Sequence, residues 1–166
     1  HYEDYLKSFL LLYGDGSVRE LSWPDGTNVG WYENGQKSHE YGDDRIERAW
    51  YESGKEHYVW LPDNTKREWG DSERHSLIYE RTADGTERRW ADDENHTLRR
   101  EEKPDGTARS WYKNGNKNVE NIFDEEINDW VARRYYNNEK NTRAYERIAD
   151  GVQRWWHENE QIKEEL

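Results

Sequence analysis

The feature that most constrains the fold is a tryptophan that follows a turn-forming aspartate by six residues, seven times along the chain. The aspartates are Asp25, Asp44, Asp63, Asp84, Asp105, Asp124 and Asp150, and the tryptophans are Trp31, Trp50, Trp69, Trp90, Trp111, Trp130 and Trp156. Successive aspartates are separated by 19, 19, 21, 21, 19 and 26 residues. Because changes of two residues preserve strand alternation, the tryptophans are predicted to share one sheet face. The long last interval predicts an insertion around Arg133–Asn141.

Two further columns accompany the tryptophans. Threonine stands two residues after the aspartate in four units, and arginine stands four residues after it in five, at Arg48, Arg67, Arg88, Arg109 and Arg154. Side chains two apart lie on the same face of a strand. The motif Asp-x-Thr-x-Arg-x-Trp therefore predicts an ordered face that repeats across the sheet. The sixth unit, Asp124 to Trp130, matches this motif worst.

Turn signals recur about every ten residues, many of them Asp-Gly or Asn-Gly pairs that suit tight β-hairpin turns. Leu, Ile, Val and Phe together number only 23 of 166 residues, whereas the chain has 10 Trp and 12 Tyr. This composition predicts an aromatic-rich sheet without a thick aliphatic core. The predicted fold is all-β: an elongated, single-layer, twisted antiparallel sheet of seven or eight tandem hairpins of roughly 20 residues.

The chain is predicted to divide into three parts. Residues 1–13, HYEDYLKSFLLLY, are the most apolar stretch and form an N-terminal cap, either a short helix or the first strand, since so short an apolar run fits both periods. Residues 14–160 form the hairpin repeats. Residues 161–166 form a charged C-terminal edge strand or tail, and charge at an edge opposes edge-to-edge association.

Two segments carry a family resemblance. PDGTNVGWYENGQK at residues 24–37 and PDGTARSWYKNGNK at residues 104–117 resemble the Trp-Tyr-x-Asn-Gly repeats of MORN-variant proteins of bacteria and phages. The resemblance implies side-by-side hairpins and a binding or scaffold role, and it supplies no catalytic site. The family's Gly-x-Trp-x-Tyr strand start is not kept here. A weaker resemblance connects the chain to the tyrosine-aspartate repeats of large secreted toxins, whose Tyr-Asp pair is absent at the matching position.

The Trp and Arg columns have two interpretations. They either form a structural spine in which each ring packs against neighbouring Arg and Thr side chains with a cation–π contribution, or they present a row of ligand-binding tryptophans. Identical spacing in every unit favours the spine. The search for a binding surface therefore moves to positions that vary between units, and the candidates are the aromatic residues Tyr32, Tyr51, Trp60, Tyr79 and Tyr112.

No catalytic, cofactor or metal motif is present. The six histidines share no column and lack metal-ligand spacing, and the acidic clusters at Asp43-Asp44, 92–94 and 124–126 fit solvated turns. No phosphate loop, nucleophile elbow or zinc motif occurs. We therefore predict a protein that is not an enzyme, with no catalytic residues, no cofactor and no metal.

Charge narrows the range of partners. The formal net charge is −12, which disfavours nucleic-acid backbones and membrane surfaces and suits a basic protein partner. We expect a scaffold that binds another protein or self-associates. The alternatives are an acidic decoy that imitates nucleic acid and a glycan-binding aromatic module. No apolar run reaches membrane-spanning length. A cytoplasmic location is expected, with secretion left open because the lack of cysteine fixes no redox compartment.

Overall fold

The computed structural model describes residues 8–166, and these residues form sixteen β-strands and no helix. Each strand is antiparallel to its neighbours, and the order of strands in the sheet follows the order of the chain. The all-β prediction of tandem hairpins in one open sheet is therefore confirmed. The chain separates into two compact units, residues 1–83 and 84–166.

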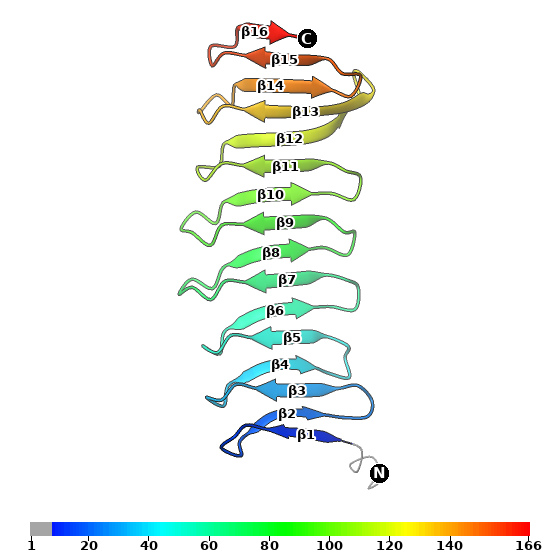
Figure 1. The fold of residues 1–166 in the computed structure, drawn as a ribbon, viewed down its shortest axis with the longest axis vertical. Coiled ribbons are helices and arrows are strands. Elements are labelled where there is room, and N and C mark those ends of the chain that lie inside the picture. The colour runs from blue at the N-terminus through cyan, green and yellow to red at the C-terminus, as the bar shows by residue number, and fades with distance from the viewer. Residues whose placement is uncertain (1–7) are drawn as a thin grey trace. The chain divides into compact units, whose positions relative to one another are not determined.

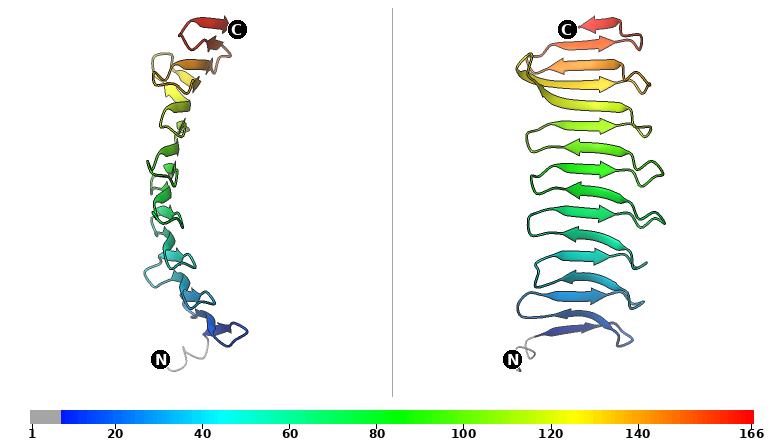
Figure 2. Two further views of the ribbon diagram at one scale, coloured as in Figure 1. Left: turned by 90° about the vertical axis from the view of Figure 1, so that its left-hand side faces the viewer. Right: turned by 180° about the vertical axis from the view of Figure 1, so that it is seen from behind.

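The first unit contains strands β1 to β8. Their bounds are β1 Phe9–Leu12, β2 Val18–Ser22, β3 Asn28–Trp31, β4 Lys37–Tyr41, β5 Glu47–Trp50, β6 Glu56–Trp60, β7 Lys66–Trp69 and β8 Leu77–Arg81. Within this unit the strands lie in a single layer (Figures 1 and 2). Phe9–Leu12 form a strand paired with β2, so the described part of the predicted N-terminal cap is β-structure. Residues 1–7 of that cap lie outside the described residues.

The second unit contains strands β9 to β16. Their bounds are β9 Glu87–Trp90, β10 Leu98–Glu102, β11 Ala108–Trp111, β12 Lys117–Asp124, β13 Asp129–Tyr135, β14 Arg143–Ile148, β15 Gln153–Trp156 and β16 Ile162–Glu165. This unit is also a single layer, with a longer hairpin at β12–β13 (Figure 1). The C-terminal segment forms β16, whose four residues are all exposed.

Each anchor aspartate builds its turn in the same way. The side-chain Oδ1 accepts a hydrogen bond from the backbone N–H two residues later, at 2.9 Å in Asp25–Thr27 and 2.8 Å in Asp105–Thr107. The other anchors, Asp44, Asp63, Asp84, Asp124 and Asp150, make the equivalent bond. This side-chain bond adds to the backbone hydrogen bonds of the same turn, such as that from the Gly26 N–H to the Trp23 carbonyl at 3.1 Å, and explains the aspartate column.

A β-bulge marks the other end of each hairpin. Beside Trp50, for example, Trp50 pairs with Glu56 and Ala49 with Tyr58, so that His57 is the extra residue. The same register shift occurs beside the other column aromatics, Trp31, Trp69, Trp90, Trp111, Tyr135 and Trp156. The repeat is therefore defined by a bulge at one end and an aspartate turn at the other.

The sixth unit departs from the predicted column. The residue at the bulge is Tyr135, which pairs with Arg143, whereas Trp130 pairs with Phe123 at the opposite end of β13. The Trp130 ring lies edge-on to Phe123 and against the turn glycine Gly106. The predicted insertion at residues 133–141 is also misplaced, because the additional residues lengthen the β12–β13 hairpin. Tryptophan spacing alone was misleading here, since a longer hairpin moved the repeat position to a tyrosine.

Few side chains are fully buried, as expected for single-layer units. Among apolar residues only Ala49 and Val131 are buried in residues 8–166, and the buried set also includes Thr65, Glu120 and Glu146. Burial of two glutamates in so thin a structure requires paired cations. The stabilising contacts of the sheet are therefore cross-strand contacts between neighbouring side chains rather than a conventional core.

Arg45 provides a test of the backbone conformation that the aspartate turns require. It adopts a left-handed φ of 58° at the turn position where Gly26 and Gly106 have φ 91°. This region costs an L-residue about 1–2 kcal/mol, partly offset by the greater freedom of glycine in the unfolded chain. Arg45→Gly should therefore raise the free energy of unfolding by about 0.5–1 kcal/mol in a denaturant titration.

Gly26→Ala is the matched control. A Cβ at Gly26 would meet nothing within 4 Å, so this substitution changes only the backbone conformational cost. It should lower the free energy of unfolding. Equal stabilities for Gly26→Ala and the wild type would contradict the account of the turn.

Candidate functional site

The middle register position of every strand belongs to one cross-strand row, which we call the ladder. In the first unit it comprises Leu10, Leu21, Val29, Glu40, Arg48, Val59, Arg67 and Glu80. In the second unit it comprises Arg88, Glu101, Arg109, Glu120, Arg133, Glu146, Arg154 and Glu165. Arginine and glutamate alternate without interruption in the second unit. Opposite charges directly across an antiparallel pair stabilise a sheet.

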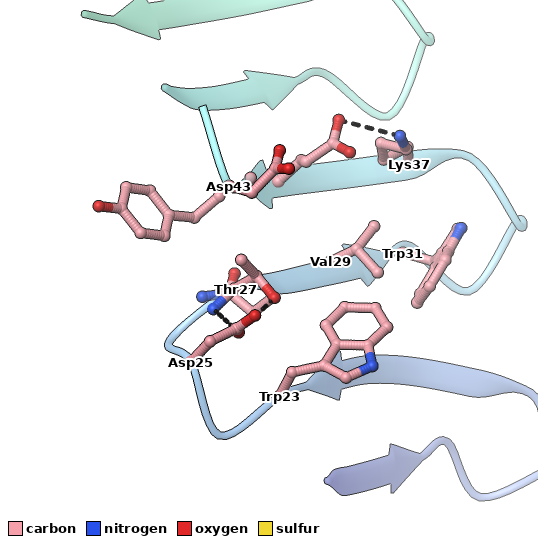
Figure 3. A pocket seen from close by; sticks show the side chains of 11 residues that line it. Trp23, Asp25, Thr27, Val29, Trp31, Lys37 and Asp43 are labelled. Carbon is pink, nitrogen blue, oxygen red and sulfur yellow. Dashed lines mark hydrogen bonds and ion pairs between the residues drawn. The ribbon is translucent and has the colours of Figure 1, made fainter. Parts of the chain in front are cut away.

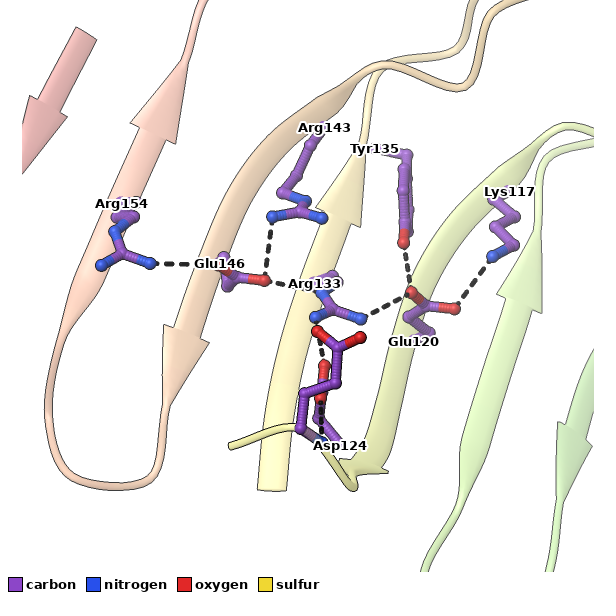
Figure 4. Close-up of polar contacts among 9 residues, drawn as sticks. Lys117, Glu120, Asp124, Arg133, Tyr135, Arg143, Glu146 and Arg154 are labelled. Carbon is purple, nitrogen blue, oxygen red and sulfur yellow. Dashed lines mark hydrogen bonds and ion pairs between the residues drawn. The ribbon is translucent and has the colours of Figure 1, made fainter. Parts of the chain in front are cut away.

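Arg133 shows the ladder at its most complete (Figure 4). Its guanidinium bonds Glu146 at 2.6 Å and Asp124 at 2.7 Å, and it lies 3.6 Å from Glu120. Arg154 continues the row through Glu146 at 3.7 Å and Glu165 at 2.7 Å. A guanidinium suits this geometry because its fixed fork of donors can serve several carboxylates at once.

The network fixes the protonation states of its members, with Glu120 and Arg133 charged and Tyr135 neutral. Burial alone raises the pKa of Glu120, but hydrogen bonds from Tyr135 and Lys117 and the charges of Lys117 and Arg133 outweigh it, so the Glu120 pKa lies below its usual value. Burial lowers the pKa of Arg133, yet its bonds to Glu146 and Asp124 raise it overall. Burial and the Glu120 carboxylate raise the pKa of Tyr135. All three groups therefore keep their ordinary neutral-pH protonation states.

The column aromatics lie on the same strand face as the ladder, which we call the ladder face. Lys37 lies 5.2 Å from the centroid of the Trp50 ring, Lys117 lies 5.3 Å from Tyr135, and Arg143 lies 5.1 Å from Trp156. Each of these cations also pairs with a ladder glutamate three residues later. The predicted cation–π contacts thus use the first residue of the returning strand, a position that sequence reasoning missed.

The predicted Arg column has a different role from stacking on the tryptophans. Arg67 bonds Glu80 and Arg88 bonds Glu101, both at 2.9 Å, and Arg109 lies 3.5 Å from Glu101. The glutamates that pair with these arginines form a regular column of their own. Each stands 11 or 13 residues after the ladder arginine of the preceding strand, as Glu165 does after Arg154 and Glu146 after Arg133. That spacing was readable in the sequence, but it becomes meaningful only when the hairpin register is known.

Three of the five candidate binding aromatics bond to the backbone of the next hairpin. The hydroxyls of Tyr32 and Tyr51 donate to the carbonyls of Trp50 and Trp69 at 2.8 and 2.7 Å, and Tyr112 donates to the Tyr135 carbonyl at 3.0 Å. These bonds link successive hairpins. Trp60 is the exposed member, at 43%, and Tyr79 is half-buried.

Two histidines share a position that the sequence analysis did not recognise. His75 and His96 each stand six residues after a column tryptophan, have left-handed φ values of 49° and 46°, and stack on Trp69 and Trp90. They therefore belong to the repeat and are not incidental surface residues.

The ladder is broken in the first unit at Val29, where other units carry arginine. An open groove of about 550 Å³ lies there, with Trp23 and Trp31 beside Val29 (Figure 3). Asp25, Glu40 and Asp43 contribute carboxylates to its lining, and Lys37 contributes one amine. The groove is the candidate binding site because it joins an aromatic surface to a ladder carboxylate that lacks an arginine on one side.

Glu40 differs from the other interior ladder glutamates. Its side chain is 35% exposed, whereas those of Glu80, Glu101, Glu120 and Glu146 are between 5% and 16% exposed. Lys37 binds its Oε2 at 3.1 Å. The carboxylate of Glu40 is therefore accessible from solvent, whereas the carboxylates of the other four ladder glutamates are largely covered.

Residues 8–166 contain no group of three or more His, Asp or Glu side chains placed to hold a metal ion. Over the same residues, no helix has the length and apolar character required to cross a membrane.

Comparisons with known proteins give little beyond this geometry. No protein-family model matches the chain, and no curated protein matches it. A solved structure titled "Crystal Structure of TcdB2-TccC3-Cdc42" aligns with 89% of this chain at 9% sequence identity and a TM-score of 0.26. This chain spans 10% of the length of that matched chain.

Removing one buried ladder charge should be strongly destabilising. The Glu146 side chain is 6% exposed and lies near three arginines, so Glu146→Gln removes the carboxylate that Arg133 bonds at 2.6 Å and that Arg143 and Arg154 share. Breaking a buried ion pair costs about 3–5 kcal/mol. Because this sheet has a single layer, we expect the lower end of that range, about 3 kcal/mol, in denaturant unfolding.

Glu165→Gln provides the comparison within the same ladder. That side chain is 53% exposed and pairs with Arg154 at 2.7 Å. Its loss should cost less than about 1 kcal/mol. Similar losses for Glu146→Gln and Glu165→Gln would show that burial does not govern the energetics of the ladder.

Acid should destabilise the fold through its carboxylates. The Thr27 hydroxyl and N–H lower the pKa of Asp25, the Thr65 N–H and hydroxyl lower that of Asp63, and the network lowers that of Glu120. Depressed folded-state pKa values contribute stability that is fully present above the unfolded values, 3.8 for Asp and 4.5 for Glu, and is lost as pH falls through the folded ones. The melting temperature should therefore stay level down to about pH 5 and fall below about pH 4.

A triple variant isolates the turns. Asp25→Asn, Asp63→Asn and Asp105→Asn keep the acceptor oxygen, as Asn34 does for Gln36, but remove the titrating groups. The melting temperature of this variant should decline less steeply in acid than that of the wild type. Identical acid profiles would refute the contribution of the turn aspartates.

Proposed function

We propose that the chain is a non-catalytic repeat scaffold that binds another protein through its ladder face. The observation that supports this proposal most directly is the groove at Val29, where an aromatic surface lies beside an accessible ladder carboxylate. Flat or grooved surfaces with aromatic residues and a few polar groups are typical of protein interfaces. The rigid sheet would present this surface without a large ordering cost.

Charge points to a basic partner. The groove is lined by three carboxylates against one amine, and the whole chain carries a net charge of −12. Such a surface would attract a basic protein at a distance and favour its approach. It would also repel nucleic-acid backbones.

The state of the ladder carboxylates supports a binding role over catalysis. Glu120 and Glu146 are buried and bound to several cations, so they are ill placed to exchange protons with a substrate. A general acid or base needs a free position beside the reacting group and a pKa near the working pH. These glutamates are better suited to hold the scaffold together.

A second candidate function rests on the turn aspartates. Asp25, Asp44 and Asp63 lie in equivalent turns of the first unit and are exposed. Each uses its Oδ1 to hold the turn; Asp25 and Asp63 carry their negative charge at the surface, whereas Asp44 pairs with Arg48 at 2.8 Å. A regular row of this kind is the feature that an acidic decoy of nucleic acid would use.

Affinity capture from the source cells, followed by purification and titration of the captured protein, tests both candidates. A scaffold should bind its partner with an affinity that falls only moderately between about 0.05 and 0.5 M salt, because aromatic contacts are not screened. A decoy should lose most of its affinity over that range. A variant that carries only Asp63→Asn and Asp105→Asn, and so keeps the groove carboxylates Asp25 and Asp43, should retain scaffold binding and weaken decoy binding.

Sedimentation of the purified chain distinguishes binding to another protein from self-association. A scaffold for another protein should be monomeric alone and form a defined complex with the captured partner. Concentration-dependent self-association in place of a captured partner would indicate assembly of copies. A monomer that captures no partner at any salt concentration would overturn the proposal.

A further inference from the structure

We propose that the groove at Val29 receives an arginine side chain from the basic protein partner, whose guanidinium takes the place that the ladder leaves empty. This inference rests on the proposed function and names the chemistry that its site recognises. Its basis is the repeat itself, because the other units show what normally fills this position.

Neighbouring units provide the structural precedent. At positions equivalent to Val29, Arg67 and Arg88 place a guanidinium nitrogen 2.9 Å from a glutamate on the following strand. Val29 pairs directly with Glu40 in the same register, but its side chain reaches no carboxylate. The sheet therefore contains a built carboxylate partner for a guanidinium that the chain itself does not supply.

The surroundings of Val29 match the shape of that group. Trp23 and Trp31 border the groove beside Val29 (Figure 3). The Lys37 amine binds Glu40 at 3.1 Å and lies 5.2 Å from the centroid of the Trp50 ring. A planar guanidinium can stack on an indole ring while its edge bonds a carboxylate, which a compact ammonium cannot do. The volume of about 550 Å³ lies within the roughly 300–1,000 Å³ range of small-ligand sites.

Charge complementarity supplies the remaining argument. Asp25 and Asp43 lie in turns on either side of the groove and add negative potential beyond Glu40. The Thr27 hydroxyl and N–H hold Asp25 in place at 2.7 and 2.9 Å. A single arginine within an extended basic segment would therefore meet one carboxylate inside the groove and two at its rim.

The test uses the full chain and two blocked peptides, Gly-Ser-Arg-Ser-Gly and its lysine counterpart. The readout is the indole N–H signals of Trp23 and Trp31 in nuclear magnetic resonance spectra, assigned with Trp23→Phe and Trp31→Phe. The arginine peptide should shift these two signals with millimolar affinity, and the lysine peptide should bind at least about threefold more weakly. Equal affinities, or shifts confined to other tryptophans, would overturn the proposal.

Val29→Arg fills the site from within. Its own guanidinium should pair with Glu40, abolish the peptide-induced shifts and leave the melting temperature at or above the wild-type value. Gln161→Arg adds the same charge at an exposed turn of the second unit and should leave the shifts unchanged. Glu40→Gln, which keeps the shape of the site, should weaken binding about tenfold. Wild-type binding by both Val29→Arg and Glu40→Gln would refute the arginine site.

The two proposals fail in different ways. If the arginine peptide shifts neither Trp23 nor Trp31 while the wild-type chain still captures its partner, the groove assignment is wrong and the scaffold function stands. If the wild-type chain captures no partner, the proposed function is wrong whatever the peptide does. Loss of partner capture in Val29→Arg but not in Gln161→Arg would support both.

Discussion

The structure depends on neutralising charge from strand to strand. A single-layer sheet has no second layer against which apolar side chains can be buried, and this chain has few aliphatic residues to bury. In the second unit, arginine and glutamate instead alternate along one row, and the guanidinium groups join neighbouring strands. Individual surface ion pairs contribute little, but a network whose members are partly buried and held in fixed geometry can contribute more. The ladder therefore takes much of the role that an aliphatic core has in other β-proteins.

Aromatic residues complete this arrangement beside the charges. Tyrosine hydroxyls bond to the backbone of the next hairpin, as Tyr32 does to Trp50, and cations such as Lys117 cover the rings while pairing with ladder glutamates. One side chain thus serves two neighbours, which suits a chain in which large side chains are plentiful and small apolar ones are scarce. Because the side chains lie on an open sheet face, the shorter Val29 at a ladder position occupied elsewhere by arginine leaves a groove at the surface and not a cavity within a core.

Much of the fold follows from local chemistry that the sequence displays. Aspartates at fixed intervals predicted the turns because an aspartate bonds its own backbone two residues on, and the six-residue interval to tryptophan predicted the strands. The site could be predicted only in part. Three features depend on the register in which strands pair. They are the glutamate column, the bulge that brings Lys37 opposite Trp31, and the presence of Tyr135, not Trp130, at the bulge of β13. Register is a property of two strands together, and in the β12–β13 hairpin the sequence offered an equally regular but incorrect alternative.

The lengthened β12–β13 hairpin has a consequence for how such chains can vary. Its added residues lie at the turn end, away from the bulge, and the pairs Glu120↔Arg133 and Val119↔Arg134 keep their register despite them. Growth at this end therefore leaves the interlocked part of the repeat intact. The turn at residues 125–128 is accordingly a natural attachment point, where a peptide epitope or a small domain can be inserted without altering the surface on the rest of the sheet.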